Sequence, residues 1–595
     1  MAAPNRNTLW ADIFVDELAR GGLKAACIAP GSRSTPLTVA FARHPAITVY
    51  SLLDERGAAY FALGLALATG QPAALVCTSG TAAANFFPAI VEANSAQVPL
   101  LVLTTDRPHE LRHSGANQTI DQVKLYGNHV RWFVDAALPE TGDLALRSLR
   151  TLAQRAVAAT IGLPPGPVHL NFPFRKPLEP TSQPGDLPEK LVDSARTDGQ
   201  PYTRVQRGQL LPSHSQVDAL AESLTAARRG LIICGPRCPG GDFPAAVTRL
   251  ALATGYPVLA DALSGLRFGP HVDALGEQLI SGYDTFLAAA AATEWPPPEL
   301  ILRFGAMPVS MAVGRYLGVH AGGRHIQVSD TGVWQDDTHT TSDFLWANPA
   351  AACDSVGAQL GDVQPDGPWL ARWRAADEAV RRAVDLARER DFFEGDILNE
   401  VVNSVPQNTH LFVGNSLIVR HLDQLVWHKN KNIRVYANRG ASGIDGVTAT
   451  ALGVAAASGP LVLVTGDVSF YHDLNSLLAL RRLGLAATIV VINNNGGGIF
   501  HRLPIANFDP PFTEMFLTPH GLNFAAAAEL FGLDYVRVAG REAFRDAFSK
   551  PVITPAAKII EVTTDSVHHE QVRRQIIAQV AGQMQNPGNP SLTNS

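Results

Sequence analysis

Two short apolar runs in the last third of the chain, 460–465 and 487–492, most constrain what it can fold into. Each run has the length of a strand and is apolar enough to be buried on both faces, as strands of parallel sheets are. Between them, residues 474–480 have the apolar periodicity of a helix. The three segments predict a right-handed strand–helix–strand unit, which brings both strand ends to one edge of the sheet.

Oxygen-bearing side chains follow both apolar runs. Asp467 and Asn494 lie 27 positions apart (494 − 467), and Gly496 belongs to a glycine-rich stretch just after Asn494. A carboxylate, an amide oxygen and a Gly-rich backbone suit Mg²⁺, which usually takes one or two protein ligands together with phosphate oxygens. Either half alone fits a structural strand-end Asp or an Asn-Gly turn. Both halves at this spacing predict a magnesium-diphosphate anchor.

The same alternation of apolar runs and helical segments recurs along the chain and predicts an α/β protein with three doubly wound parallel-sheet domains. We expect a first domain over 1–180, a central spacer domain over 205–355, a third domain over 390–585 and a disordered tail over 586–595. A Pro-, Gly- and Ser-rich stretch around 177–215 is typical of a linker. Strands are expected at 25–29, 48–52, 73–78, 100–104, 168–171, 230–234, 257–260, 300–303 and 325–329.

Composition excludes several classes of protein. The 595 residues are 46% hydrophobic and 17% charged, which is ordinary for a globular protein. A net charge of −6 without a long basic block argues against nucleic acid or an anionic membrane as the partner. The odd number of scattered cysteines predicts no disulfide framework. Residues 1–22 hold no apolar signal core, and no run of about 18 apolar residues occurs, so we expect a cytoplasmic protein without a membrane span.

Further polar clusters near expected strand ends point to anion binding. In 31–36, Ser and Thr can cap the next helix, the helix N-terminus attracts anions, and Arg33 offers a fork for a carboxylate. The clusters at 105–120, 414–420 and 437–446 also place an Arg beside Ser, Asn or Gly. Glu55 stands before an apolar helix expected at 58–68, where by itself it could merely favour the helix dipole.

Taken in order, the segments 31–36, 54–57, 78–82, 115–118, 438–446 and 493–497 resemble thiamine diphosphate-dependent enzymes. Within that family they are most similar to the synthases that act on 2-oxoglutarate and isochorismate in menaquinone and phylloquinone synthesis. The resemblance covers nearly the whole chain and is weakest in the middle domain. It departs at Val468, where the wider family usually has Gly. It implies the pyruvate-decarboxylase-like architecture and thiamine diphosphate with Mg²⁺, or alternatively Mn²⁺, as cofactors.

The resemblance also implies a transferase reaction and a role for each matching residue. 2-Oxoglutarate would lose carbon dioxide, and the remaining succinyl unit would add to the double bond of isochorismate. Glu55 would activate the aminopyrimidine ring, and Ile444 would wedge between the two cofactor rings. The metal ligands would be Asp467, Asn494 and Gly496. The other cofactor-binding residues would be Gly466, Val468, Gly497 and Ile499. The substrate-binding residues would be Ser32, Arg33, Arg107, Asn117, Gln118, Ser416, Arg420, Arg439, Phe500 and Leu503.

The resemblance leaves alternatives for one substrate-facing side chain, the oligomeric state and the activity. Met311 stands where the family carries a substrate-facing Lys, so either Arg315 substitutes for it or the contact is dispensable. The family implies a homodimer or homotetramer with active sites between subunits. A different thiamine diphosphate-dependent decarboxylase or carboligase, similar to acetolactate synthase, would share Glu55 and the metal ligands. A non-catalytic relative would be expected to have lost one of them. The end product, menaquinone or phylloquinone, is also undetermined.

Overall fold

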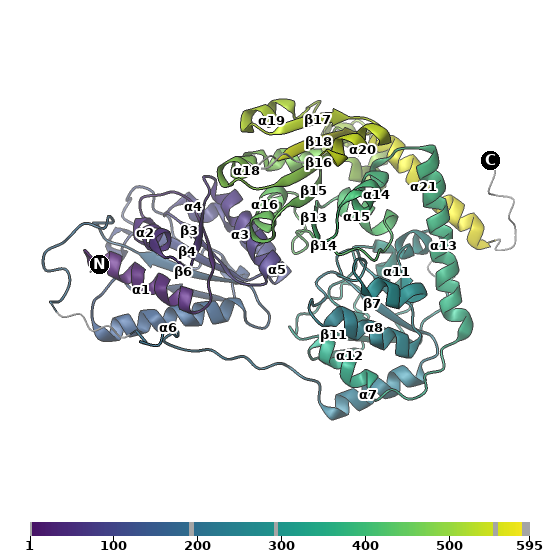
Figure 1. The fold of residues 1–595 in the computed structure, drawn as a ribbon, viewed down its shortest axis with the longest axis horizontal. Helices are drawn as coiled ribbons and strands as arrows, with labels where there is room; N and C mark the ends of the chain where they lie inside the picture. Colours follow the sequence, from purple (N-terminus) through teal and green to yellow (C-terminus); the bar gives the residue numbers. More distant parts are fainter. Residues whose placement is uncertain (1–2, 190–194, 291–294, 551–556, 586–595) are drawn as a thin grey trace. The chain divides into compact units, whose positions relative to one another are not determined.

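The structure is a computed structural model that describes residues 3–189, 195–290, 295–550 and 557–585 (Figure 1). It contains three six-stranded parallel sheets with interleaved helices, as the sequence predicts. The tail expected at 586–595 lies outside the described residues. In the part of the chain that is described, no helix is both long and apolar enough to cross a membrane.

The first sheet has the strand order β2-β1-β3-β4-β6-β5. Its strands are β1 (Ala25–Ile28), β2 (Thr48–Ser51), β3 (Ala73–Cys77), β4 (Leu100–Asp106), β5 (Trp132–Asp135) and β6 (Pro167–Pro173). Its helices are α1 (Arg6–Arg20), α2 (Thr35–Arg43), α3 (Glu55–Thr69), α4 (Thr81–Asn85), α5 (Phe87–Ala96) and α6 (Asp143–Thr160). Every residue of β3, β4 and β6 is buried, because helices cover both faces of a parallel sheet.

The second sheet has the order β12-β11-β10-β7-β8-β9. Its strands are β7 (Gly230–Cys234), β8 (Val258–Ala260), β9 (Leu279–Ile280), β10 (Leu300–Phe304), β11 (Arg324–Ser329) and β12 (Asp343–Trp346). Its helices are α7 (His214–Ala226), α8 (Phe243–Thr254), α9 (His271–Leu275), α10 (Tyr283–Ala289), α11 (Met311–Val319) and α12 (Pro349–Gly357). The long helix α13 (Gly367–Arg390) follows and buries Trp369 and Trp373 in a hydrophobic cluster with strands β7 and β10.

The third sheet has the order β14-β13-β15-β16-β18-β17. Its strands are β13 (Thr409–Val413), β14 (Ile433–Tyr436), β15 (Leu461–Gly466), β16 (Ala487–Asn493), β17 (Asp534–Val538) and β18 (Lys558–Thr563). The helices in this part of the chain are α14 (Glu394–Ser404), α15 (Leu417–Leu425), α16 (Val447–Ser458), α17 (Asp467–His472), α18 (Leu477–Leu483), α19 (Ala525–Phe531), α20 (Arg541–Ser549) and α21 (Ser566–Gln585). The crossover helix expected at 474–480 is instead a 3₁₀ turn, Leu474–Ser476, continued by α18.

Contacts between elements divide the chain into two units. Unit 1 comprises Met1–Gly208, Asn438–Leu461 and His472–Ala487, and unit 2 comprises the rest of the chain. Helices α16 and α18 therefore belong with the first sheet, and α16 packs closely against α3. The remainder of the third sheet belongs with the second sheet.

Candidate active site

The two strand ends that the sequence predicts to meet do meet in unit 2. β15 and β16 are neighbours in the sheet, and Asp467 begins α17 directly after β15. One carboxylate oxygen of Asp467 accepts the backbone N–H of Val468 (2.7 Å), and the other accepts that of Gly496 (3.0 Å). His520 Nε2 lies 3.1 Å from the second oxygen. Burial raises the pKa of Asp467 above its ordinary value, and the hydrogen bonds it accepts oppose that shift.

Asn494 directly follows β16, the strand next to β15. Its Nδ2 donates to Glu394 at 2.9 Å, whereas its Oδ1 is buried and has no hydrogen-bond partner among the described residues. Gly496 has φ +138°, and a Cβ on it would lie 2.0 Å from the carbonyl oxygen of Leu517, so only glycine fits. A buried carboxylate, an orphaned amide oxygen and a tight glycine turn together suit a hard cation.

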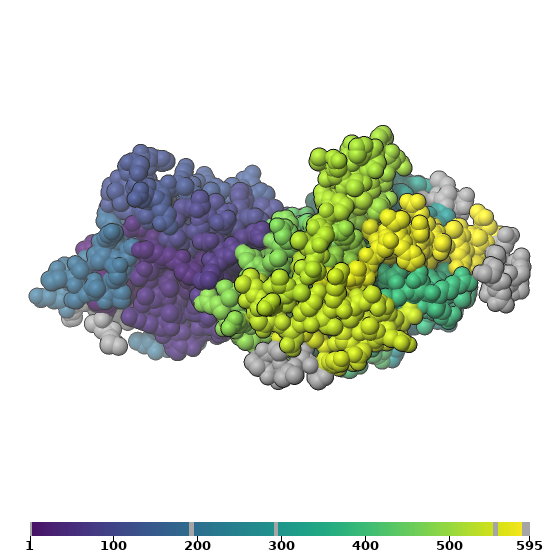
Figure 2. Space-filling view, turned by 90° about the horizontal axis from the view of Figure 1, so that it is seen from above, coloured from purple at the N-terminus to yellow at the C-terminus, as the bar shows by residue number. Residues whose placement is uncertain are grey.

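Apolar residues continue from this turn. Ile499 and Phe500 lie half-buried in a 3₁₀ segment, Gly498–Arg502, and the ring of Phe500 meets that of Phe516 edge-on with centroids 5.4 Å apart. Leu503 is 46% exposed. Figure 2 shows in yellow-green the longer stretch of the chain around these residues, much of which reaches the surface in that view. These apolar side chains therefore remain partly accessible in the segment that follows the glycine turn.

Ser416 and Arg420 lie at the end of the neighbouring strand β13. The Gly414 N–H donates to the carbonyl of Val464 in β15 at 2.8 Å, which holds this loop beside the strand that leads to Asp467. Ser416 has φ +62° at the start of α15, and Arg420 Nη1 donates to its carbonyl at 2.5 Å. Both residues thus lie at the sheet edge where the sequence placed them.

Glu55 is the first residue of α3 in unit 1 and is half-buried. Its neighbours fix the start of the helix. Asp54 accepts the Gly57 N–H (3.0 Å) and the side-chain amide of Asn475 (2.8 Å). Arg56 donates to the carbonyl of His472 at 2.6 Å. Glu55 therefore lies at a helix N-terminus whose position is fixed by hydrogen bonds from the residues before and after it.

One buried carboxylate of unit 1 accepts hydrogen bonds from the loop that carries Arg439 and Ile444. Glu92, 2% exposed, accepts backbone N–H groups from three consecutive residues, Gly440 (2.6 Å), Ala441 (2.7 Å) and Ser442 (3.1 Å). Burial raises the pKa of Glu92, and these hydrogen bonds and Arg439 oppose that shift.

The same loop is fixed a second time just before α16. The Tyr60 hydroxyl donates to Asp445 at 2.7 Å. A Cβ on Gly446 would lie 2.0 Å from the ring of Tyr60, and Gly446 has φ +66°. These contacts hold Ile444, which is half-buried, in the same unit as Glu55.

Polar residues around Arg33 and Arg107 form a cationic cluster in unit 1. Arg107 donates to Ser79 Oγ and to the Asn117 carbonyl, both at 2.8 Å, and Gln118 Nε2 donates to the Ser79 carbonyl at 3.1 Å. Arg33 is 6% exposed, and its Nε has no hydrogen-bond partner in the described part of the chain. Burial and the nearby Arg107 lower the pKa of Arg33 to about 10. A bound anion would relieve both effects.

One local prediction about this cluster is wrong. The Ser34 side chain does not cap α2, and its hydroxyl instead donates to the Gly31 carbonyl at 2.9 Å. Gly31 is required by space, because a Cβ there would lie 2.2 Å from Cβ of Thr78. Ser32 is exposed beside Arg33.

In unit 2, Met311 is 72% exposed at the start of α11, and Arg315 is also exposed.

The candidate residues are divided between the two units. Glu55, Ile444 and Arg439 belong with the Arg33 cluster in unit 1, whereas Asp467 and Asn494 belong to unit 2. Sequence reasoning missed four residues that hold these groups: Ser79, Glu92, Glu394 and His520. Ser79 lies in a segment that the sequence marked, but no local pattern distinguishes the other three.

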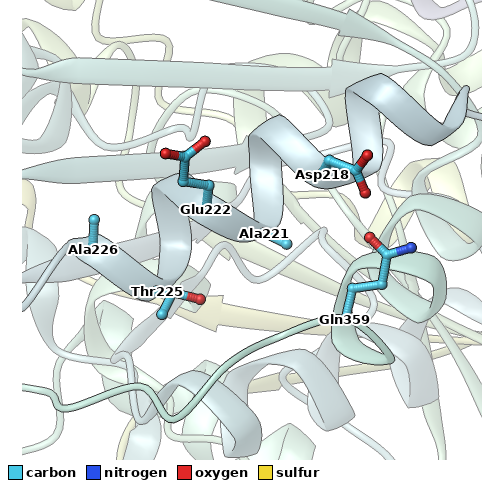
Figure 3. A pocket seen from close by; sticks show the side chains of 6 residues that line it. All are labelled: Asp218, Ala221, Glu222, Thr225, Ala226 and Gln359. Atoms are coloured by element: carbon cyan, nitrogen blue, oxygen red, sulfur yellow. The ribbon is translucent and has the colours of Figure 1, made fainter.

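A separate pocket lies on the second-sheet domain (Figure 3). Its lining residues are Asp218, Ala221, Glu222, Thr225, Ala226 and Gln359. Two of these six are acidic and none is basic, so the pocket is unsuited to a dicarboxylate. It is not a competing site for an anionic substrate.

The chain is similar to known proteins over nearly its whole length. Three family models match: the N-terminal TPP binding domain of thiamine pyrophosphate enzymes at 10–125, the middle domain of thiamine pyrophosphate at 190–413, and the C-terminal TPP binding domain at 419–562. A protein of Roseiflexus castenholzii is 53% identical over 586 residues, covering 97% of this chain and 99% of its own. A protein of Haloarcula marismortui is 47% identical over 591 residues, covering 98% of this chain and 99% of its own. Both relatives are named 2-succinyl-5-enolpyruvyl-6-hydroxy-3-cyclohexene-1-carboxylate synthase.

Proposed function

The chain belongs to the 2-succinyl-5-enolpyruvyl-6-hydroxy-3-cyclohexene-1-carboxylate synthase family of thiamine pyrophosphate enzymes, and on that premise we propose that it joins 2-oxoglutarate to isochorismate. 2-Oxoglutarate loses carbon dioxide, and its succinyl unit adds to the double bond of isochorismate. The family predicted from the sequence motifs is confirmed by the matches over nearly the full chain.

One observation carries the proposal. The side-chain oxygen Oδ1 of Asn494 is buried and has no hydrogen-bond partner among the residues that the structure describes, and Asn494 follows the strand next to the one that leads to Asp467. Asp467, Asn494 and the backbone of Gly496 would hold a magnesium ion and, through it, the diphosphate of the cofactor. A bound cation would also compensate the buried charge of Asp467. When bound, thiamine diphosphate supplies the electron sink for decarboxylation, and the protein supplies orientation and charge.

The remaining cofactor residues divide by unit. The Glu55 carboxyl would exchange a proton with the aminopyrimidine ring. The hydrogen bonds that Asp54 accepts fix the start of α3, where Glu55 lies. Ile444 would support the bent cofactor from the loop whose backbone donates hydrogen bonds to Glu92. In unit 2, the backbone and side chains that follow β15 and β16 would line the cofactor: Gly466, Val468, Gly497 and Ile499.

Substrate carboxylates would bind to the arginines. Arg33 is a buried cation with an unused donor, and Arg107 stands beside it, so a dicarboxylate gains charge-assisted hydrogen bonds there. Ser32, Asn117 and Gln118 would complete that side. Ser416, Arg420 and Arg439 would serve the second anionic group, and Phe500 and Leu503 would form the apolar wall.

An assay of both substrates tests the proposal. Purified protein is incubated with 2-oxoglutarate and isochorismate, with and without thiamine diphosphate and Mg²⁺, while isochorismate consumption and carbon dioxide release are followed. We expect both signals to require cofactor and metal. Equal turnover with pyruvate in place of 2-oxoglutarate would favour an acetolactate-synthase-like carboligase, and no cofactor-dependent turnover would favour a non-catalytic relative.

We also propose that the active enzyme is a homodimer or homotetramer whose sites form between subunits. The support is the division of the proposed groups between the two units of the chain. Mixing tests this arrangement: Glu55→Gln and Asp467→Ala proteins, each inactive, are unfolded together and reassembled. In mixed dimers one of the two sites would carry both intact residues, so activity should return to about a quarter of the wild-type value. No recovery would indicate sites within one chain.

A further inference from the structure

The amide of Asn494 is oriented by a buried carboxylate that has no role in the family motif. Glu394 is the first residue of α14, and its side chain is fully buried. It lies 100 positions before Asn494 in the sequence, and its Oε1 accepts the Nδ2–H of that amide at 2.9 Å. All residues of this contact belong to unit 2.

Three donors from different elements hold the Glu394 carboxylate. Besides Asn494, the Thr564 hydroxyl lies 3.2 Å from Oε1, and Nε2 of His421 in α15 lies 3.1 Å from Oε2. The carboxylate lies at a helix N-terminus, where a negative charge is favoured. A side chain that is held at both oxygens and fully enclosed cannot rotate away from Asn494.

This fixed acceptor determines which end of the amide faces outward. A carboxylate only accepts hydrogen bonds, so the Asn494 atom that faces it must be the NH₂ group. The opposite orientation would place Oδ1 against a carboxylate oxygen and leave the amide NH₂ where a cation is expected. In the observed orientation Oδ1 is buried and has no hydrogen-bond partner within the described ranges of the chain, so it is available as a metal ligand.

We infer that Glu394 is a positioning residue for the divalent cation: it locks the amide of Asn494 with its oxygen outward and adds a buried negative charge behind that ligand. The inference rests on the metal site of the proposed function. Ligand-orienting partners of this kind typically change metal affinity by about 10- to 100-fold when removed.

The same residues raise one alternative, a transition-metal site. Ligand atoms of Glu394, His421 and His569 lie within 4.8 Å of one another, and all three residues are buried. Metal-bound histidines almost always donate their second ring N–H to a partner. Here His421 Nδ1 and both nitrogens of His569 have no hydrogen-bond partner among the described residues, and the two rings pack edge-to-face with centroids 4.3 Å apart. The positioning role therefore accounts for more of the geometry.

Magnesium titration in the presence of saturating thiamine diphosphate tests the inference. Intrinsic Trp fluorescence or calorimetry gives the apparent Mg²⁺ dissociation constant for the full-length protein. We expect Glu394→Gln to raise that constant at least tenfold, because a Gln can donate to Oδ1 and permits the flipped amide. Excess Mg²⁺ should restore cofactor binding, which a general folding defect would not allow.

Thr564→Val is the matched control, because it removes another hydrogen bond to the same Glu394 oxygen and leaves Asn494 untouched. Its Mg²⁺ constant should stay within about twofold of wild type. If Glu394→Gln does not fold, Glu394→Asp keeps the charge but is one methylene too short to hold the amide, and it should weaken Mg²⁺ binding in the same direction.

Asp467→Ala separates the two claims. If it weakens Mg²⁺ binding while Glu394→Gln and Glu394→Asp leave it unchanged, only the positioning role is wrong. If Asp467→Ala has no effect on Mg²⁺ binding, the metal site of the proposed function is wrong. Elemental analysis completes the test: about one zinc or iron per chain in wild type, lost in Glu394→Gln, would overturn the positioning role in favour of the alternative.

Discussion

Gly64 of α3 and Gly453 of α16 lie in backbone contact within unit 1. A Cβ on Gly64 would lie 2.9 Å from the Cα of Gly453, and a Cβ on Gly453 would lie 3.0 Å from the Cα of Gly64. Each added atom would also lie 2.0 or 2.1 Å from a carbonyl oxygen of the facing helix. Glu55 and Ile444 precede these glycines by nine residues each (64 − 55 and 453 − 444). The glycine contact therefore sets how closely the helix that begins at Glu55 approaches the helix that follows Ile444.

Gly453→Ala should destabilise the protein, because the atoms in the way are backbone and the helices must move apart. We expect the free energy of unfolding to fall by about 1–3 kcal/mol, as for other overpacked sites, and the melting temperature to fall with it. Gly582→Ala in α21 is the control, since its Cβ would meet no atom within 4 Å. That variant should be as stable as wild type or up to about 1 kcal/mol more stable. Equal melting temperatures for the two variants would contradict the close contact.

Glu55→Gln should retain thiamine diphosphate binding and lose most turnover. The amide keeps the size of the side chain but cannot exchange a proton with the cofactor ring, and general acid–base groups typically contribute about 10²–10⁴-fold. Cofactor affinity is measured by fluorescence titration and turnover by isochorismate consumption. Glu110→Gln, an exposed acid of the same unit paired with Arg175, should keep full turnover. Full activity in Glu55→Gln would remove this residue from the mechanism.

Arg33→Ala should raise the KM for a dicarboxylate substrate by about 10- to 100-fold. A lost charge-assisted hydrogen bond costs about 1.5–3 kcal/mol, and each 1.4 kcal/mol is about tenfold in affinity. Steady-state kinetics with each substrate varied in turn gives the value. Arg147→Ala, which removes only an exposed pair with Asp143, should leave KM unchanged. Arg33 also donates to the Phe174 carbonyl at 2.8 Å, so thermal unfolding is recorded in parallel. An unchanged KM would argue against substrate contact.

His169 should make stability depend on pH. Thr104 Oγ1 donates to Asn171 Oδ1 (2.8 Å) and lies 2.7 Å from His169 Nε2, so Nε2 carries the proton and the buried Nδ1 has no partner in the described residues. Burial lowers the pKa of His169 to about 3. As pH falls from about 6.5, the unfolded chain therefore binds a proton that the folded chain does not.

From pH 6.5 to 5 this difference should lower the free energy of unfolding by about 2 kcal/mol, at about 1.4 kcal/mol per pH unit. His169→Phe keeps an aromatic ring beside Tyr126 and Phe133 and cannot titrate. Denaturant unfolding at pH 5, 6 and 7 measures both proteins. The variant should show the shallower pH dependence, and identical slopes would mean that His169 is not the group that titrates.

Local sequence was sufficient for much of the fold and of the candidate site. Strand β7 has the predicted bounds, and β1, β3 and β11 differ from prediction by one residue. Buried parallel strands are continuous apolar runs, so they are visible without any tertiary information. Strands β5, β9 and β12 are not among the predicted strands, because they are short or half-exposed and lack such a run. Strands β13, β14, β17 and β18 of the third sheet are not among them either.

The sequence by itself determined the three-sheet α/β architecture, the family, and the strand ends at which we expect the cofactor to bind, because apolar periodicity and motif spacing are local properties. Only the tertiary structure decided what holds those groups. Glu92 accepts a hydrogen bond from Gly440, which lies 348 positions away in the sequence. Glu394 accepts one from Asn494, which lies 100 positions away. A lone buried acid has no sequence signature, since its role depends on which donors the fold brings to it. The approach of Gly64 to Gly453 is decided in the same way, by helix packing rather than by either helix alone.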